Sequence, residues 1–232
     1  MSHERKLILD TETTGLNYNE DKIIEIGIVE LIDNVLTSNF FHVYINPQRT
    51  ISSSAQKVHG LTNQFLENKP IFSEISEQLL NFIKNDILII HNAEFDTTFI
   101  NKELENCGFK SMNNKIIDTI QIAKKEFPGQ TVNLDSLCRK LNVINTRKDF
   151  HGALLDANLL SKVYLNLTTG KQEKLKLNLE NEKITQQGNL NQNYIDKFNK
   201  PRKQLMLLSE NEKKNHENFI NEMTDPIWKK IR

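Results

Sequence analysis

The chain has 232 residues, which is enough for one well-packed domain and an appended segment. Its 30 basic and 30 acidic side chains cancel, which excludes a strong long-range field of either sign. The charge is uneven, because residues 1–170 hold 17 basic and 21 acidic side chains whereas residues 171–232 hold 13 and 9. An acidic domain that handles a phosphate backbone needs something to offset the repulsion, and divalent cations can do so.

No stretch of 18 apolar residues occurs, and the apolar run near the N-terminus is too short for a signal peptide. The two cysteines, Cys107 and Cys138, are far apart and lack metal-type spacing. We therefore expect a soluble protein of the reducing cytoplasm, with ordinary thiols and no membrane partner.

The predicted elements alternate between strands and helices along residues 1–170. Short apolar runs predict strands at Lys6–Asp10, Ile23–Ile32, Phe40–Ile45 and Asp86–His91. Apolar residues at helical spacing predict helices at Ser73–Lys84, Phe95–Asn106, Ile117–Glu126, Leu134–Leu141 and Ala153–Leu167. Three strands, a helix, a strand and more helices indicate an α/β domain with a mixed central sheet.

The composition changes after Gly170. Residues 171–203 are rich in Lys, Asn, Gln and Glu, which predicts a flexible linker. Large apolar residues return in residues 204–232, but this segment is too small to bury a core of its own.

A pair of carboxylates ends the first predicted strand. Asp10 and Glu12 are two residues apart, so both side chains point to the same face of the sheet. Neighbouring carboxylates repel each other and raise each other's pKa unless a cation lies between them, and Mg²⁺ or Mn²⁺ suits such oxygen ligands. The alternative is a solvated strand end.

Two more acidic groups lie at element boundaries. Asp96 is expected in the first turn of a helix that follows a buried strand, where α/β sheets place ligand sites. Alternatively, it only favours the helix N-terminus electrostatically. Asp156 follows His151 by five residues, about 140° apart on one helix, so the two converge only if His151 lies in the preceding loop. Gly152 is expected to permit that bend, and the alternative is a structural or surface histidine.

These four carboxylates and one histidine match the needs of two-metal phosphodiester hydrolysis. Two cations about 4 Å apart stabilise the attacking and leaving oxygens, and a base of near-neutral pKa deprotonates the water.

The segments DTETTGL, HNAEFD and HGALLDA, in this order, resemble the three motifs of the DEDDh exonucleases in the ribonuclease H-like superfamily. Within that family, VHGLTNQFLENKPIF and HGALLDANLL are most similar to epsilon-type proofreading subunits of bacterial DNA polymerase III. The resemblance covers about residues 5–170 and implies a ribonuclease H-like fold, two Mg²⁺ or Mn²⁺ ions and action on DNA 3′ ends.

The resemblance also implies roles for individual residues. The implied metal ligands are Asp10, Glu12, Asp96 and Asp156, and the implied general base is His151. The implied contacts to substrate are Asp10, Glu12, Thr13, Leu16, His59, Asn92 and Asp156, where Leu16 packs on the terminal base. Phe95 is expected in the core, and Glu94 in solvent.

The segment after Gly170 suggests a tether. Gln172, Leu175 and Leu177 resemble a Q-x-x-L-x-[LF] clamp-binding peptide, although a polar linker with incidental leucines is the alternative. Residues 204–232 resemble a polymerase-binding tail for the alpha subunit, and Trp and Met are favoured interface anchors. Its expected anchors are Phe219, Ile220, Met223 and Trp228. A small helix folded back on the catalytic domain is the alternative.

Two rival functions remain open at this stage. One is a DEDDh exoribonuclease that trims RNA or oligonucleotides, which the polymerase-like tail disfavours. The other is an adaptor that mainly links polymerase and clamp, which the complete set of acidic residues disfavours.

Overall fold

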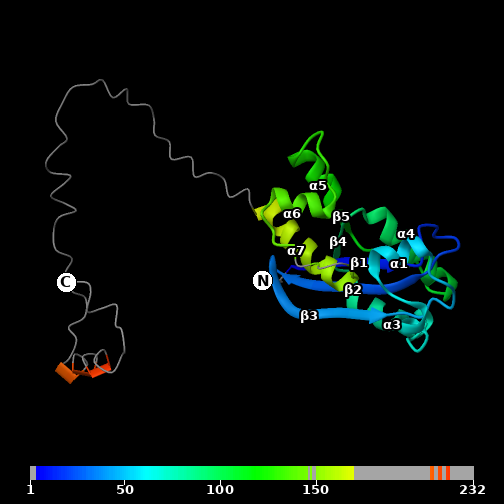
Figure 1. Cartoon of the computed structure of the whole chain (residues 1–232), viewed down its shortest axis with the longest axis horizontal. Helices are drawn as coiled ribbons and strands as arrows, with labels where there is room; N and C mark the ends of the chain where they lie inside the picture. Colours follow the sequence, from blue (N-terminus) through cyan, green and yellow to red (C-terminus); the bar gives the residue numbers. More distant parts are fainter. Residues whose placement is uncertain are drawn as a thin grey trace. The chain divides into compact units, whose positions relative to one another are not determined.

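The computed structural model describes residues 4–145, 147, 150–169, 210–211, 214–215 and 218–219 (Figure 1). The chain divides into two units, residues 1–176 and 177–232. The first unit contains every strand and long helix among the described residues, whereas the six described residues of the second unit are exposed and helical. None of the helices described is long and apolar enough to cross a membrane.

The first unit contains a five-stranded sheet in the order β3-β2-β1-β4-β5. The strands are β1 (Arg5–Thr13), β2 (Ile23–Ile32), β3 (Val35–Tyr44), β4 (Ile87–Ile90) and β5 (Ile116–Asp118). The first three are antiparallel neighbours, and β4 pairs parallel with both β1 and β5. Asp33 and Asn34 form the β2–β3 turn with φ of 50° and 63°, the left-handed conformation that two-residue hairpin turns need.

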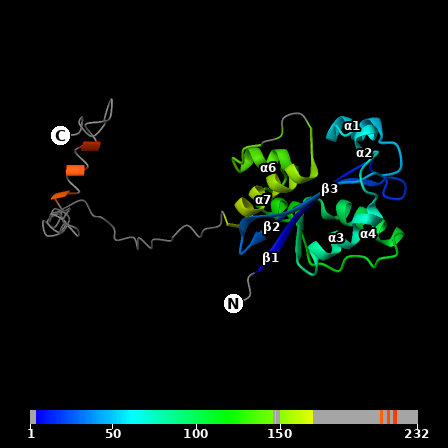
Figure 2. The same ribbon diagram turned by 90° about the horizontal axis from the view of Figure 1, so that it is seen from below.

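Helices cover both faces of the sheet (Figure 2). They are α1 (Ser53–His59), α2 (Asn63–Leu66), α3 (Phe72–Ile83), α4 (Ala93–Asn106), α5 (Thr119–Glu126), α6 (Leu134–Lys140) and α7 (Ala153–Thr169). One core joins α3 and α4 to Leu7 and Leu9 of β1, and a second joins α5, α6 and α7 to Ile8. The predicted mixed α/β sheet flanked by helices is confirmed.

Four elements differ from the sequence prediction. The helices α1 and α2 have seven and four residues and were not predicted. Strand β5 was predicted as the beginning of the following helix. Strand β3 begins at Val35 rather than at the predicted Phe40. The prediction missed its first residues because they are mostly exposed and show no buried apolar pattern.

Candidate active site

The end of β1 carries the first carboxylate pair. Leu7 and Leu9 enter the core on the α3–α4 side whereas Ile8 enters the core on the α7 side. Because side chains alternate along a strand, Asp10 and Glu12 share the face of Ile8 and point toward α7. Strand β4 pairs with only the first part of β1, so the acidic end of β1 extends beyond its parallel neighbour. This overhang leaves room for a ligand.

The acidic groups meet closely enough to change one another's titration. Burial raises the pKa of Asp10 well above its usual range, and the charges of Asp96, Asp156 and Glu12 raise it further. Burial, followed by the charges of Asp156 and Glu25, raises the pKa of Glu12 to about 8. Carboxylates from β1, α4 and α7 therefore lie close to one another, where a bound cation would relieve their repulsion.

Helix α4 holds Asp96 in its first turn. The helix begins after Asn92, whose φ of 66° places it in the left-handed region. The backbone N–H of Asn92 donates to Asp118 Oδ1 at 3.2 Å, which fixes the entry into the helix. Burial raises the pKa of Asp96 to about 7, against a hydrogen bond of 2.6 Å that Thr11 Oγ1 donates to its carboxylate.

Helix α7 brings Asp156 to the sheet through a close approach to β2. A Cβ on Gly27 of β2 would lie 2.2 Å from the backbone nitrogen of Leu154, so only glycine permits this contact. Asp156 is 4% exposed, with buried alanines at positions 153 and 157 beside it. The position of this carboxylate is therefore set by backbone packing rather than by a flexible loop.

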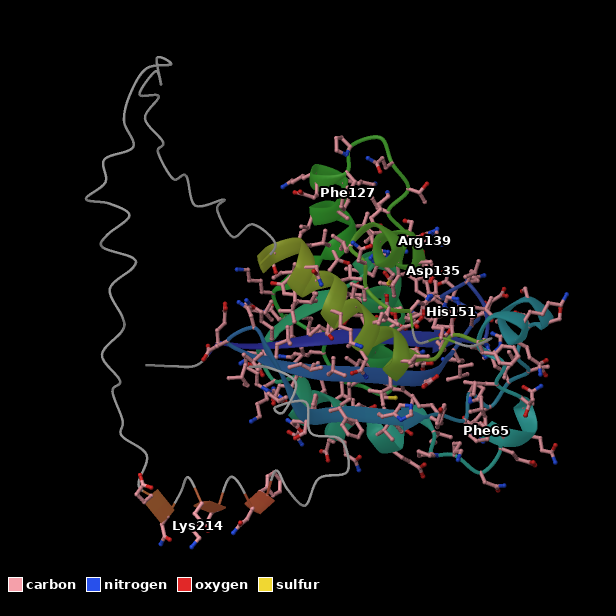
Figure 3. All side chains as sticks on the ribbon, turned by 60° about the vertical axis from the view of Figure 1, so that its left-hand side comes forward. Phe65, Phe127, Asp135, Arg139, His151 and Lys214 are labelled. Carbon is pink, nitrogen blue, oxygen red and sulfur yellow. The ribbon has the colours of Figure 1, made fainter. Side chains whose placement is uncertain are left out.

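His151 lies in the segment before α7, as the sequence analysis expected (Figure 3). Its Nδ1 is 3.1 Å from Asp156 Oδ2, and its side chain is 41% exposed. Its backbone N–H donates to Val58 O at 3.0 Å, at the end of α1. The ring of Phe150 packs over Gly60, where a Cβ would meet it at 2.7 Å. The end of α1 thus supports the histidine segment.

The bend before α7 does not depend on glycine. Gly152 is not among the residues with positive φ, and a Cβ there would meet only the carboxylate of Glu25, at 3.8 Å. The bend that Gly152 was expected to permit therefore does not require a glycine at this position. The glycine that the arrangement requires is Gly27, on the facing strand.

The donor set fits a hard divalent cation. Glu12, His151 and Asp156 each offer a ligand atom, and these atoms lie within 4.8 Å of one another. Two of the donors are carboxylates, the groups that Mg²⁺ and Mn²⁺ prefer. Asp10 and Asp96 are two further carboxylates nearby. Their pKa values are raised, so a bound cation would help to ionise them.

Arg147 is a charged neighbour that sequence reasoning missed. Its Nε lies 2.5 Å from Asp156 Oδ1 and its Nη1 lies 2.5 Å from Asp135 Oδ1. With His151 on the other oxygen, both oxygens of Asp156 are engaged by cationic or titratable groups. A metal ion at this carboxylate must compete with these contacts.

A hollow of about 270 Å³ adjoins the acids, lined in part by Glu12, Thr13, Leu16, His59 and Phe95. Leu16 is 83% exposed at its rim. His59 is buried, and its Nδ1 accepts a hydrogen bond from the backbone of Leu61, so its Nε2 carries the proton. Within the described part of the chain, that Nε2 is the one buried side-chain polar atom without a hydrogen bond of ordinary geometry, although an interaction of the ring with the backbone of Thr13 opposes the lowering of its pKa by burial. Such a donor can serve a ligand in the hollow.

A second hollow of about 280 Å³ also has Leu16 in its lining, together with Tyr18, Asn92 and Phe95. Phe95 is partly buried and its ring is 4.8 Å from that of Phe99, whereas Glu94 is exposed. A larger hollow of about 490 Å³, near Arg49 and Glu67, has none of the predicted site residues in its lining.

The remaining predicted residues belong to the C-terminal segment. Phe219 is helical and 59% exposed. Gln172, Leu175, Leu177, Ile220, Met223 and Trp228 lie outside the described residues.

Comparison with known proteins identifies the family of the chain. Residues 7–164 match the exonuclease family RNase_T. DNA polymerase III subunit epsilon of Buchnera aphidicola from Acyrthosiphon pisum is 50% identical over 183 residues, which cover 75% of this chain and 77% of that protein. The epsilon subunit of Rickettsia felis is 39% identical over 95% of this chain and 97% of its own.

The chain belongs to the exonuclease family. Its relatives at this level of identity are DNA polymerase III epsilon subunits, which confirms the family expected from the motifs. Among solved structures, the nuclease domain of the DEDDh family member 3′hExo superposes with a TM-score of 0.64 at 18% identity, covering 73% of this chain and 94% of that chain. Exonuclease X superposes with a TM-score of 0.57 at 24% identity, covering 72% and 92%. These structures share the fold of this exonuclease.

Proposed function

We propose that this exonuclease removes single nucleotides from DNA 3′ ends as the proofreading subunit of a replicative polymerase. The observation that carries the proposal is the meeting of carboxylates from β1, α4 and α7, with raised pKa values, beside a histidine. The identity to epsilon subunits over most of the chain supports the choice of DNA.

In the proposed site, Asp10, Glu12, Asp96 and Asp156 hold two Mg²⁺ or Mn²⁺ ions. Such ions supply charge stabilisation for the attacking and leaving oxygens of an in-line displacement. Thr11 keeps Asp96 oriented through its hydrogen bond to the carboxylate.

His151 acts as the general base. Its Nδ1–H donates to Asp156 Oδ2, which leaves Nε2 unprotonated and able to accept a proton from water. The water oxygen then bonds to phosphorus and the bond from phosphorus to the 3′ oxygen breaks. The released 3′ oxygen of the shortened strand takes a proton from solvent, and a nucleoside 5′-monophosphate leaves. The exposed side chain of His151 allows the proton to pass on to solvent.

The terminal nucleotide occupies the hollow beside the acids. Leu16 packs on the terminal base, Thr13 contacts the 3′ end, and His59 donates from its Nε2. Asn92 lines the neighbouring hollow. Separating a mismatched 3′ end from its template costs less energy than separating a paired end, so mismatched termini enter the active site more readily.

The C-terminal segment acts as a tether in this proposal. Residues 204–232 bind the polymerase alpha subunit, with the exposed Phe219 among the anchors, and Gln172, Leu175 and Leu177 bind the sliding clamp. Residues 171–203 form the linker, which raises the local concentration of exonuclease at the primer end. Co-elution with the alpha subunit should disappear when residues 200–232 are removed, and co-elution of the truncated chain would refute the tail assignment.

Digestion of 5′-labelled primers tests the catalytic proposal. With Mg²⁺, the full chain should release single nucleotides, faster from mismatched than matched DNA and slowly from RNA of the same sequence. Asp10→Asn should lower the rate by at least about a thousandfold. Glu77→Gln, which removes an exposed carboxylate of α3, is the matched control and should leave the rate unchanged. Preferred digestion of RNA would favour the exoribonuclease alternative.

A further inference from the structure

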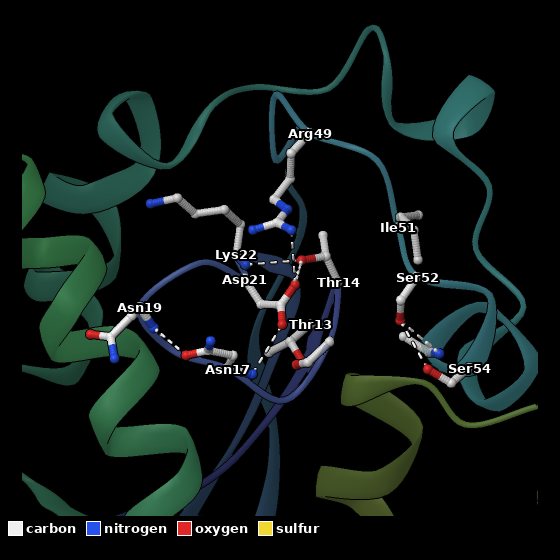
Figure 4. A network of polar contacts seen from close by, with 12 residues as sticks. Thr13, Thr14, Asn17, Asn19, Asp21, Lys22, Arg49, Ile51, Ser52 and Ser54 are labelled. Atoms are coloured by element: carbon white, nitrogen blue, oxygen red, sulfur yellow. Dashed lines mark hydrogen bonds and ion pairs between the residues drawn. The ribbon is translucent and has the colours of Figure 1, made fainter.

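Leu16 lies in the loop between β1 and β2 and lines the hollow beside the acids. The carboxylate of Asp21 organises this loop (Figure 4). The carboxylate of Asp21 is 13% exposed and accepts two hydrogen bonds. Thr14 Oγ1 donates to its Oδ1 at 2.8 Å, and the backbone N–H of Asn17 donates to its Oδ2 at 3.0 Å. The two donors flank the Gly15–Leu16 segment on both sides.

The same carboxylate packs against Gly15. A Cβ at Gly15 would lie 2.4 Å from Asp21 Oδ2, so the carboxylate occupies the space that a side chain would need. The backbone of Asp21 closes the loop as well, since its N–H donates to Asn17 O at 2.6 Å. Asp21 therefore contacts the residue before Leu16 through its side chain and the residue after Leu16 through side chain and backbone.

Further contacts fix the loop to the sheet. Thr14 N–H donates to Lys22 O at 2.9 Å, and Lys22 N–H donates to Thr14 Oγ1 at 3.0 Å. Arg49 Nη2 lies 3.4 Å from Asp21 Oδ1 and joins the loop to the segment after β3. These contacts hold the backbone of the loop, whereas the side chain of Leu16 stays 83% exposed between two hollows.

We propose that Asp21 is a positioning residue for substrate binding, which holds Leu16 at the angle at which it packs against the terminal base. The inference rests on the proposed function, since it assumes that Leu16 contacts nucleic acid. Asp21 itself touches no reacting atom. Its carboxylate acts through the backbone on either side of Leu16.

The sign of the effect separates positioning from simple electrostatics. Removing a negative charge beside a DNA-binding rim should tighten binding to phosphates if charge alone matters. Removing a positioning contact should weaken binding, because Leu16 must then be ordered at the moment of association.

The test measures kcat and KM on a single-stranded DNA oligomer with Mg²⁺. Asp21→Ala should raise KM about tenfold with kcat changed less than twofold, and Leu16→Ala should do the same. The double variant should be no worse than Leu16→Ala alone. Glu20→Ala removes a neighbouring exposed carboxylate of the same loop and should leave KM unchanged or slightly lower.

A graded variant covers the case in which Asp21→Ala fails to fold. Asp21→Asn keeps the shape but has one acceptor oxygen in place of two, so it should retain one of the two hydrogen bonds and raise KM by an intermediate factor. Additive losses in the double variant, or tighter binding by Asp21→Ala, would overturn the inference. If the unmodified chain does not digest DNA at all, the proposed function itself fails.

Discussion

The acids and the histidine of the active site are mounted in different ways. Asp10 follows three strand residues that are fully buried, and Asp156 lies on a helix whose backbone touches β2 at Gly27. His151 precedes that helix in a segment supported by one backbone hydrogen bond to Val58, and its side chain is 41% exposed.

The difference follows from the work each group does. Carboxylates that repel one another stay together only if the packing around them is stronger than the repulsion, so they stand on buried elements. A base accepts a proton from water and passes it on, which requires access to solvent and tolerates motion. The carboxylates therefore lie on rigid, buried elements, whereas the base lies on a loop.

Removing the loop-borne base should lower the rate more than moving the helix that carries Asp156. His151→Ala is expected to lower kcat by about a hundredfold to ten-thousandfold, because the attacking water loses its proton acceptor. Binding of Mg²⁺, measured as an increase in thermal midpoint, should persist because the carboxylates remain.

Added imidazole provides the control for this variant. The exposed position of His151 leaves space for a free base, so imidazole should restore part of the rate. An unchanged kcat in His151→Ala would remove the histidine from the reaction.

Displacing helix α7, which carries Asp156, should have the next largest effect on the rate. Gly27→Ala places a Cβ 2.2 Å from the backbone of Leu154, so α7 must shift and carry Asp156 with it. We expect the free energy of unfolding to fall by about 1–3 kcal/mol and kcat to fall with it.

Gly152→Ala is the matched control, since its Cβ would have only an ordinary contact at 3.8 Å with Glu25. Urea denaturation and initial rates measure both variants. Equal behaviour of the two would mean that the approach of α7 to β2 does not set the site.

The same contrast explains how far the sequence predicted this molecule. Long segments, such as β2, α4 and α7, were predicted within a few residues, because β2 is buried along almost its whole length and the two helices carry apolar residues at helical spacing. The short α1 and α2 and the three-residue β5 were missed, because so few residues show no period of their own.

In the active site, the four acids and His151 were predicted from the sequence, because they lie in three short motifs at the ends of strands and the beginnings of helices. Arg147, Asp118, Glu25 and Asp21 were missed because each acquires its place through a tertiary contact. Arg147 reaches a carboxylate on α7, and Asp118 meets the start of α4 from β5. Sequence spacing carries no sign of such contacts.

Protonation of the acids should make stability depend on pH and metal together. The pKa of Glu12 is raised from 4.5 to about 8, so the folded chain holds a proton that the unfolded chain has lost. This contribution is complete below about pH 4 and is lost as pH rises toward 8. The unfolding free energy of the metal-free chain should therefore fall between pH 5 and pH 8.

Mg²⁺ at a hundredfold its Kd should add about 2.7 kcal/mol, or roughly 5–10 °C in thermal midpoint. The increment should grow from pH 6 to pH 8, because cations bind the ionised carboxylates. Glu12→Gln removes the titrating group and should flatten the metal-free profile. A metal increment independent of pH would show that these acids are not the ligands.

Replacing Arg147 should have the smallest effect on the reaction rate. Among the described residues, it is the one cationic side chain in direct contact with one of the four active-site carboxylates, that of Asp156. Arg147→Gln should lower the stability of the metal-free chain, because Asp156 is buried and loses its charged partner. The same variant should bind Mg²⁺ roughly fivefold more tightly, about 1 kcal/mol, since the ion no longer competes with the guanidinium. Arg147→Lys keeps the charge without the two-armed contact and should lie between the two. Calorimetric titration with Mg²⁺ measures the affinity, and weaker binding by Arg147→Gln would mean that the arginine supports the ion rather than competing with it.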